Sequence, residues 1–110
     1  MISRRGKIAV KERGYTVVDR ITSGRLVGLE HGDIVKAETL GMKLCRVKVE
    51  QIRVDNATGA VTEISVVIYA TKTGRPYAKA GQRRVLTEDN IIEVVDAVIR
   101  NKHGKVAEGA

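Results

Sequence analysis

Residues 45–54 alternate between apolar and charged side chains with the period of a β-strand. The alternation runs Cys45, Arg46, Val47, Lys48, Val49 and Glu50. A period of two places one face of a strand on a core and the other face in solvent. The apolar positions continue at Ile52 and Val54, on the other parity. This switch at Glu50 and Gln51 predicts a β-bulge in the strand.

A second strand follows the polar turn at residues 55–59. Residues 61–69 are rich in β-branched side chains at both odd and even positions, as at Ile64, Val66 and Val67. β-branched residues favour strands, and apolar residues on both faces predict a strand that is covered on both sides. We therefore expect this strand to be central in its sheet.

The N-terminal region has the pattern of a hairpin. Two short β-prone runs, residues 7–10 and 15–18, flank residues 11–14, which end in Gly14. A glycine at the end of such a turn accommodates the positive φ that tight turns require. The economical prediction is an N-terminal β-hairpin.

Near the C-terminus the apolar spacing is that of an amphipathic helix. Ile91, Val94, Val95 and Val98 lie at i, i+3, i+4 and i+7. Thr87 is a good N-cap, with Glu88 and Asp89 in the first turn and Arg100 and Lys102 in the last turn. We predict a helix over residues 88–102. Because β-branched residues lower helix propensity, a strand over residues 91–95 remains the alternative.

Together these elements predict an α+β fold. We expect a curved antiparallel sheet, or a small open β-barrel, packed by one C-terminal helix. The chain has 110 residues and no internal repeat or linker, so residues 1–103 are predicted to form a single basic α+β domain and residues 104–110 a disordered tail. The absence of Phe and Trp, with only three Tyr, predicts an aliphatic core.

The charge of the chain is positive and segregated. Twenty Lys and Arg outnumber 13 Asp and Glu, which gives a net charge of +7. Residues 1–20 carry six basic and two acidic side chains, and residues 61–86 carry five and one. An excess of this kind favours a polyanionic partner, of which nucleic acid is the commonest.

The main candidate binding segment is residues 72–84. It contains five cations, two glycines and a tyrosine, without one acidic residue. We expect a long, mobile loop whose cations contact phosphates and whose tyrosine stacks on one exposed base. The candidate contacts in this segment are Lys72, Arg75, Tyr77, Lys79, Arg83 and Arg84. An N-terminal basic block could extend the same surface through Arg4, Arg5, Lys7, Lys11 and Arg13.

No catalytic pattern is present in the sequence. It has no nucleophile with an adjacent base, no glycine-rich phosphate loop and no Cys/His cluster with zinc spacing. We predict a non-enzymatic protein without metal or cofactor. The single cysteine, Cys45, and the lack of a signal peptide or of an apolar run long enough to span a bilayer predict a cytoplasmic protein that does not contact a membrane.

Residues 29–37, followed by Gly41 and by residues 45–49, resemble the opening of a small barrel of Src-homology-three-like type, in particular the KOW module. The matching positions are Gly32 and Asp33, which precede a strand as the turn formers do in that family. The resemblance implies a strongly bent five-stranded barrel whose loops touch RNA, DNA or the transcription and translation machinery.

The function we predict is non-enzymatic binding of DNA or RNA through phosphate contacts, with weak sequence selectivity. Two alternatives stay open. One is an adaptor, such as a phage or plasmid factor, that docks on an acidic protein. The other is a small enzyme on a barrel scaffold whose site forms only at an oligomer interface.

Overall fold

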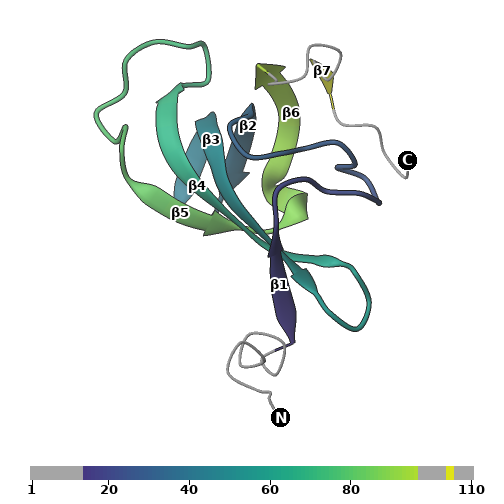
Figure 1. The fold of residues 1–110 in the computed structure, drawn as a ribbon. Helices are drawn as coiled ribbons and strands as arrows, with labels where there is room; N and C mark the ends of the chain where they lie inside the picture. Colours follow the sequence, from purple (N-terminus) through teal and green to yellow (C-terminus); the bar gives the residue numbers. More distant parts are fainter. Residues whose placement is uncertain (1–13, 97–103, 106–110) are drawn as a thin grey trace.

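The computed structural model describes residues 14–96 and 104–105, and these residues are almost all in β-strands and their connections. A single turn of 3-10 helix, η1 (Glu88–Asn90), separates two of the strands. The strands, shown in Figure 1, are β1 (Tyr15–Val18), β2 (Ile34–Thr39), β3 (Met42–Asp55), β4 (Val61–Thr71), β5 (Arg83–Leu86), β6 (Ile91–Asp96) and β7 (Gly104–Lys105).

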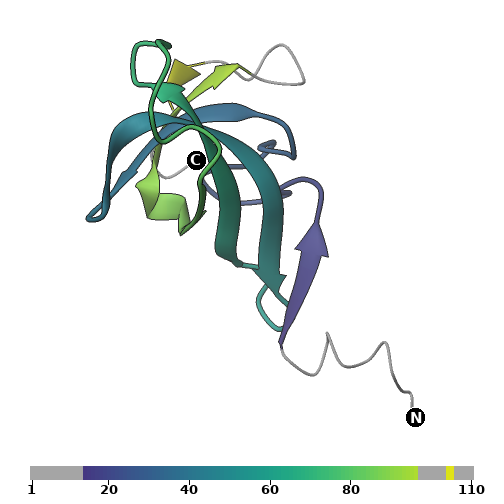
Figure 2. The same ribbon diagram turned by 90° about the vertical axis from the view of Figure 1, so that its left-hand side faces the viewer.

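All strand pairs are antiparallel. The sheet has the order β5-β4-β3-β2-β6-β7, and β1 pairs with β3 outside this path. Strands β2 to β5 therefore follow one another as a meander, and β6 returns to the edge of β2. Figure 2 shows the long strands β3 and β4 bending together, with β1 beside their lower end. The predicted curved antiparallel sheet is confirmed.

Bulges give β3 its bend. Val49 pairs with Val66 and Gln51 pairs with Ser65, so Glu50 is an extra residue without a partner across the ladder. The extra residue shifts the parity of the strand. Val49 and Ile52 are both buried, three positions apart. The bulge predicted at Glu50 and Gln51 is confirmed.

The core lies on one face of this bent sheet and is aliphatic, as predicted. Its buried residues include Val35 of β2, Val47 of β3 and Ile64 of β4. On β4 only alternate side chains are buried, and Tyr69 is 53% exposed. Strand β4 is central, between β3 and β5, but the expectation that both its faces are covered is wrong. Its β-branched residues on the outer face reflect strand propensity and not burial.

The connection between β1 and β2 closes one side of the core. It contributes three buried side chains, Ile21, Leu26 and Leu29. The Ile21 N–H donates to the Leu29 carbonyl at 2.8 Å, which makes the segment a compact hairpin-like loop. Arg25 fastens this loop to the region after β5, because its guanidinium donates to the carbonyls of Glu88 and Ile91.

The predicted C-terminal helix is wrong, and with it the α+β class. Residues 88–90 form the 3-10 turn η1, with Thr87 at its start, and residues 91–96 form the strand β6. The part of the predicted helix at residues 97–102 lies outside the described residues. Over residues 14–96 the chain contains no α-helix. The strand left open as the alternative is the one that forms.

Bulges in β6 explain why a strand has helical spacing. Ala37 pairs with Ile91, Lys36 with Glu93 and Val35 with Val94. Ile92 is therefore an extra residue, and the inward-facing Ile91 and Val94 end up three positions apart. Pairing with β6 also gives hydrogen-bond partners to the backbone N–H and C=O groups along the edge of β2, which a helix could not do.

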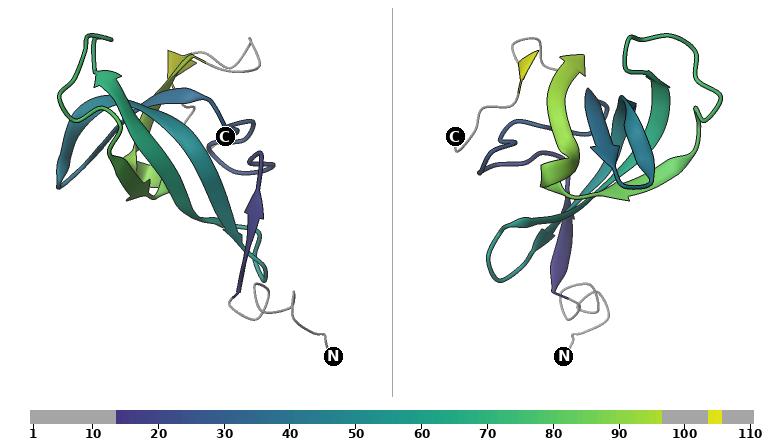
Figure 3. Two further views of the ribbon diagram at one scale, coloured as in Figure 1. Left: turned by 60° about the vertical axis from the view of Figure 1, so that its left-hand side comes forward. Right: turned by 180° about the vertical axis from the view of Figure 1, so that it is seen from behind.

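The elements predicted at the two ends of the chain fall only partly within the described residues. Gly14 has φ of +89°, and β1 forms where a strand was predicted, with Tyr15 paired to Asp55 of β3. The other half of the predicted hairpin, residues 7–10, lies outside the described residues. At the other end, Gly104 and Lys105 of the predicted tail pair with β6 as β7 (Figure 3). Residues 106–110 lie outside the described residues.

Candidate functional site

The candidate segment of residues 72–84 divides between a loop and a strand. Residues 72–82 connect β4 to β5 as the long loop at the upper left of Figure 1, whereas Arg83 and Arg84 belong to β5. The loop has regular turns at both ends. Gly74 N–H donates to the Thr71 carbonyl and Thr71 N–H donates to the Arg75 carbonyl, each at 2.9 Å. At the return, Gly81 N–H donates to the Ile68 carbonyl at 2.8 Å. These bonds tie both ends of the loop to β4.

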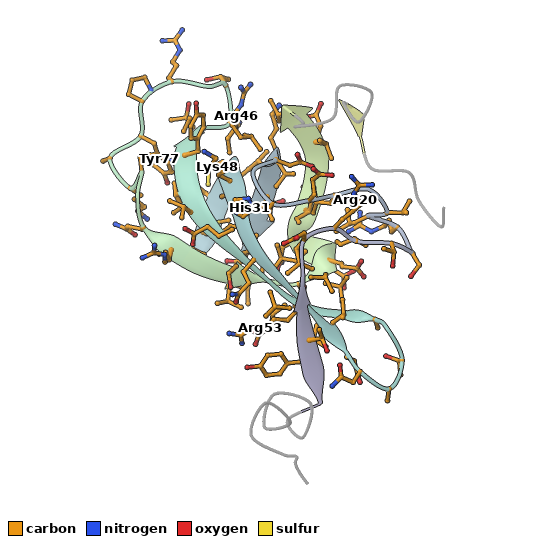
Figure 4. The ribbon with its side chains drawn as sticks, in the orientation of Figure 1. Arg20, His31, Arg46, Lys48, Arg53 and Tyr77 are labelled. Atoms are coloured by element: carbon orange, nitrogen blue, oxygen red, sulfur yellow. The ribbon has the colours of Figure 1, made fainter. Side chains whose placement is uncertain are left out.

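Arg46 of β3 supports the start of the loop. Its Nε donates to the Lys72 carbonyl at 3.3 Å. Gly74, with φ of +89°, lies directly against the Arg46 guanidinium, and a Cβ at this position would be 3.1 Å from Arg46 Nη1. Figure 4 shows Arg46 and Tyr77 at the same upper end of the sheet, with Arg20 and Arg53 elsewhere on the molecule. Arg46 therefore serves the loop as a support.

Tyr77 lies between two surface hollows. Its side chain is partly buried and packs against the core. One hollow, of about 440 Å³, lies between Tyr77, Leu44 and the residues at the start of the loop. The second, of about 610 Å³, lies between Tyr77 and the turn that joins β2 to β3, at Leu40 and Gly41. Tyr77 thus lines both hollows.

Four cations surround these hollows. Lys43 lines both of them, Lys72 and Arg75 line the first, and Lys79 lines the second. Among the described residues, no Asp or Glu lines either hollow. Over residues 14–95, the ion pairs involve Arg20, Lys36, Arg53 and Arg83, and none of the four lining cations. We call Lys43, Lys72, Arg75, Tyr77 and Lys79 the Tyr77 cluster.

Arg83 and Arg84, unlike the cations of the Tyr77 cluster, have hydrogen-bond partners for their guanidinium groups among the described residues. Arg83 Nε lies 3.1 Å from Glu50 Oε1, and the hydrogen bond to this carboxylate raises the pKa of the guanidinium. Arg84 donates to Gln82 Oε1 at 2.7 Å and to the Arg83 carbonyl at 2.8 Å. Both arginines thus hold contacts within the protein that a ligand would have to share or replace.

Cys45, on β3, is the one cysteine of the chain. Burial raises the pKa of the Cys45 thiol, and the positive charges of Arg84 and Lys79 oppose that effect. Cys45 itself is fully buried and unpaired.

The structure brings together only part of the predicted set. Lys72, Arg75, Tyr77 and Lys79 gather around the two hollows. The N-terminal candidates lie outside the described residues; they are Arg4, Arg5, Lys7, Lys11 and Arg13.

Sequence reasoning missed the contribution of the turn between β2 and β3. Lys43 and Leu40 reach the site from a segment about 30 positions away from the loop. The one available signal was Leu40, a large apolar residue in a turn, where polar residues are usual. It is fully exposed in the structure.

Comparison with protein-family models, with curated proteins and with solved structures finds no match to this chain. Over the described residues, no group of His, Cys, Asp and Glu side chains is arranged to hold a metal ion. In the same part of the chain, no helix combines the length and apolarity needed to cross a membrane.

Proposed function

We propose that this protein binds nucleic acid without catalysis, through the Tyr77 cluster. The observation that carries the proposal is the gathering of four cations around two hollows that no carboxylate of the described residues lines. Cations at this density without an acidic neighbour in that part of the chain favour a ligand with closely spaced negative charges, and a phosphate backbone supplies them. Selectivity for sequence would be weak, because phosphates carry no sequence information.

The placement of the cations suits a chain of phosphates better than one anion. Lys72 and Arg75 line the first hollow, Lys79 lines the second, and Lys43 and Tyr77 line both. A ligand that runs from one hollow to the other past Tyr77 would therefore meet positive charge in each. Arg75 adds a planar guanidinium, which forms bidentate contacts with phosphate.

The resemblance to the KOW module belongs to the same proposal. We propose that β2 to β6 form a small open barrel of this type. Its support is the run of five strands in the order β5-β4-β3-β2-β6 and the bulges that bend β3. In such a barrel the loop between β4 and β5 and the turn between β2 and β3 would form one binding rim.

An acidic protein is the second candidate partner, and one observation favours it. Within the described part of the chain, β5 pairs with β4 alone. The other edge of β5, beside the exposed Val85, could therefore accept a strand from a partner.

Titration of labelled oligonucleotides tests the proposal. The probes are a 12-nucleotide single strand of DNA, the same strand of RNA, and a DNA duplex, each at two salt concentrations. We expect dissociation constants of about 1 μM or tighter at low salt, with a steep loss of affinity as salt rises. The double variant Lys72→Gln/Lys79→Gln should reduce the salt slope for a single strand by about 1.4, because each lost phosphate contact contributes about 0.7.

The matched control is the double variant Arg20→Gln/Lys36→Gln. It lowers the net charge by the same amount, but removes cations that are already paired with Glu30 and Glu93. We expect it to bind almost as the original protein does. Equal losses of oligonucleotide affinity in the two double variants would show that binding depends only on net charge, which would contradict a site at the Tyr77 cluster. Absence of binding to all three probes would refute it, and tight binding of polyglutamate instead would favour the acidic protein partner.

A further inference from the structure

We infer that the Tyr77 cluster selects single-stranded nucleic acid, by taking an unpaired base against the Tyr77 ring. This inference rests on the proposed function and adds to it the state of the ligand. It depends on the shape of the two hollows and on the apolar side chains that line them, in addition to the charge around them.

The hollows offer room and apolar contact for a base. The first hollow, of about 440 Å³, is walled by Tyr77 and by Leu44. Tyr77 is partly buried and packs against the core, which restricts the orientation of its ring before a ligand binds. Stacking of a base on an aromatic ring that is fixed in advance avoids part of the entropy cost of binding.

Leu40 adds a second apolar contact, in the second hollow. It lies in the turn between β2 and β3, lines the second hollow with Tyr77, and is fully exposed. A large apolar side chain at this position contributes nothing to the core. Apolar side chains insert between base steps of a duplex only at the cost of unstacking them, whereas the bases of a single strand can take the same apolar contact without that cost. Leu40 and Tyr77 would thus contact two successive bases.

A duplex does not fit this arrangement. In a duplex each base is stacked on both faces and paired at its edge, so it can enter a hollow only after it leaves the stack. A single strand presents its bases without that cost, while its phosphates reach Lys72 and Arg75 on one side and Lys79 on the other. The site should therefore prefer the single strand even though the duplex carries more charge.

The test separates contacts to bases from contacts to phosphates. The probes are a 12-nucleotide thymidine strand, a fully abasic strand with the same number of phosphates, and a hairpin duplex; a uridine strand provides the RNA arm. Binding is followed by fluorescence anisotropy. We expect the thymidine strand to bind about tenfold more tightly than the abasic strand, as one or two stacked bases would give.

Variants locate the base contact. Leu40→Ser, at an exposed position that should not affect folding, and Tyr77→Leu should both lower the thymidine-to-abasic affinity ratio. Tyr77→Phe keeps the ring and should keep the ratio. Lys72→Gln should weaken both strands equally. If Tyr77→Leu does not fold, Leu40→Ser still decides the question, because the outcome expected of it differs between the two hypotheses.

The outcomes distinguish this inference from the proposed function. Equal binding of the thymidine and abasic strands, or tighter binding of the duplex, would overturn the inference and leave nucleic-acid binding intact. A ratio that Leu40→Ser leaves unchanged would also overturn it, because the bases would then be bound elsewhere. Failure of every probe to bind would overturn the proposed function itself.

Discussion

At the scale of single residues, Arg46 and Gly74 determine how the loop is placed. A Cβ at position 74 would lie 3.1 Å from Arg46 Nη1, so the Arg46 guanidinium, which also donates to the Lys72 carbonyl, would have to move slightly. Lys72 and Arg75 flank Gly74 in the chain, so a displacement of Gly74 moves both cations. The contact between Arg46 and Gly74 is therefore part of the site, although neither residue lines a hollow.

The substitution Gly74→Ala tests this contact. We expect a loss of about 1–2 kcal/mol of stability from the positive φ. We also expect oligonucleotide binding about fivefold weaker, the factor that corresponds to about 1 kcal/mol. The control is Gly59→Ala, which has φ of +76° and no heavy atom within 4 Å of the added Cβ. It should lose similar stability and keep its affinity. Equal affinities for the two variants in titrations would show that Arg46 does not support the binding loop.

At the scale of elements, the strands with a strict period were predictable and the C-terminal element was not. The alternation from Cys45 onward and its change of parity at Glu50 indicated both β3 and its bulge. The same kind of bulge in β6 placed Ile91 and Val94 three positions apart, which is also the spacing of a helix. A local pattern could not decide between the two, because the edge of β2 that β6 completes is distant in sequence.

The strand β6 predicts different roles for two adjacent isoleucines. Ile91 is buried, whereas Ile92 is 43% exposed. Ile91→Ala should therefore cost about 2–5 kcal/mol of unfolding free energy, as for other buried large-to-small changes. Ile92→Thr should change it by about 0.5 kcal/mol or less. Urea denaturation of both variants measures these values. Similar large costs at both positions would indicate that both isoleucines face the core, as on the wide apolar stripe of the predicted helix.

At the scale of the whole molecule, charge is divided between the two ends of β5. The loop that precedes β5 carries Lys72, Arg75 and Lys79, whereas Glu88 and Asp89 of η1 follow it. Opposite charge at two ends of a small protein orients its approach to a charged ligand. The sequence indicated this segregation and the excess of cations in the loop. It could not indicate that the turn between β2 and β3 completes the site, because that contact exists only in the folded chain.

The most direct test of the account is a map of where a single strand binds. Amide signals of the ¹⁵N-labelled protein are followed by NMR during titration with the thymidine strand. The account predicts the largest shifts at residues 40–43 and 72–79, which surround the two hollows. Largest shifts at residues 19–30 or at η1, with residues 40–43 and 72–79 unchanged, would contradict it.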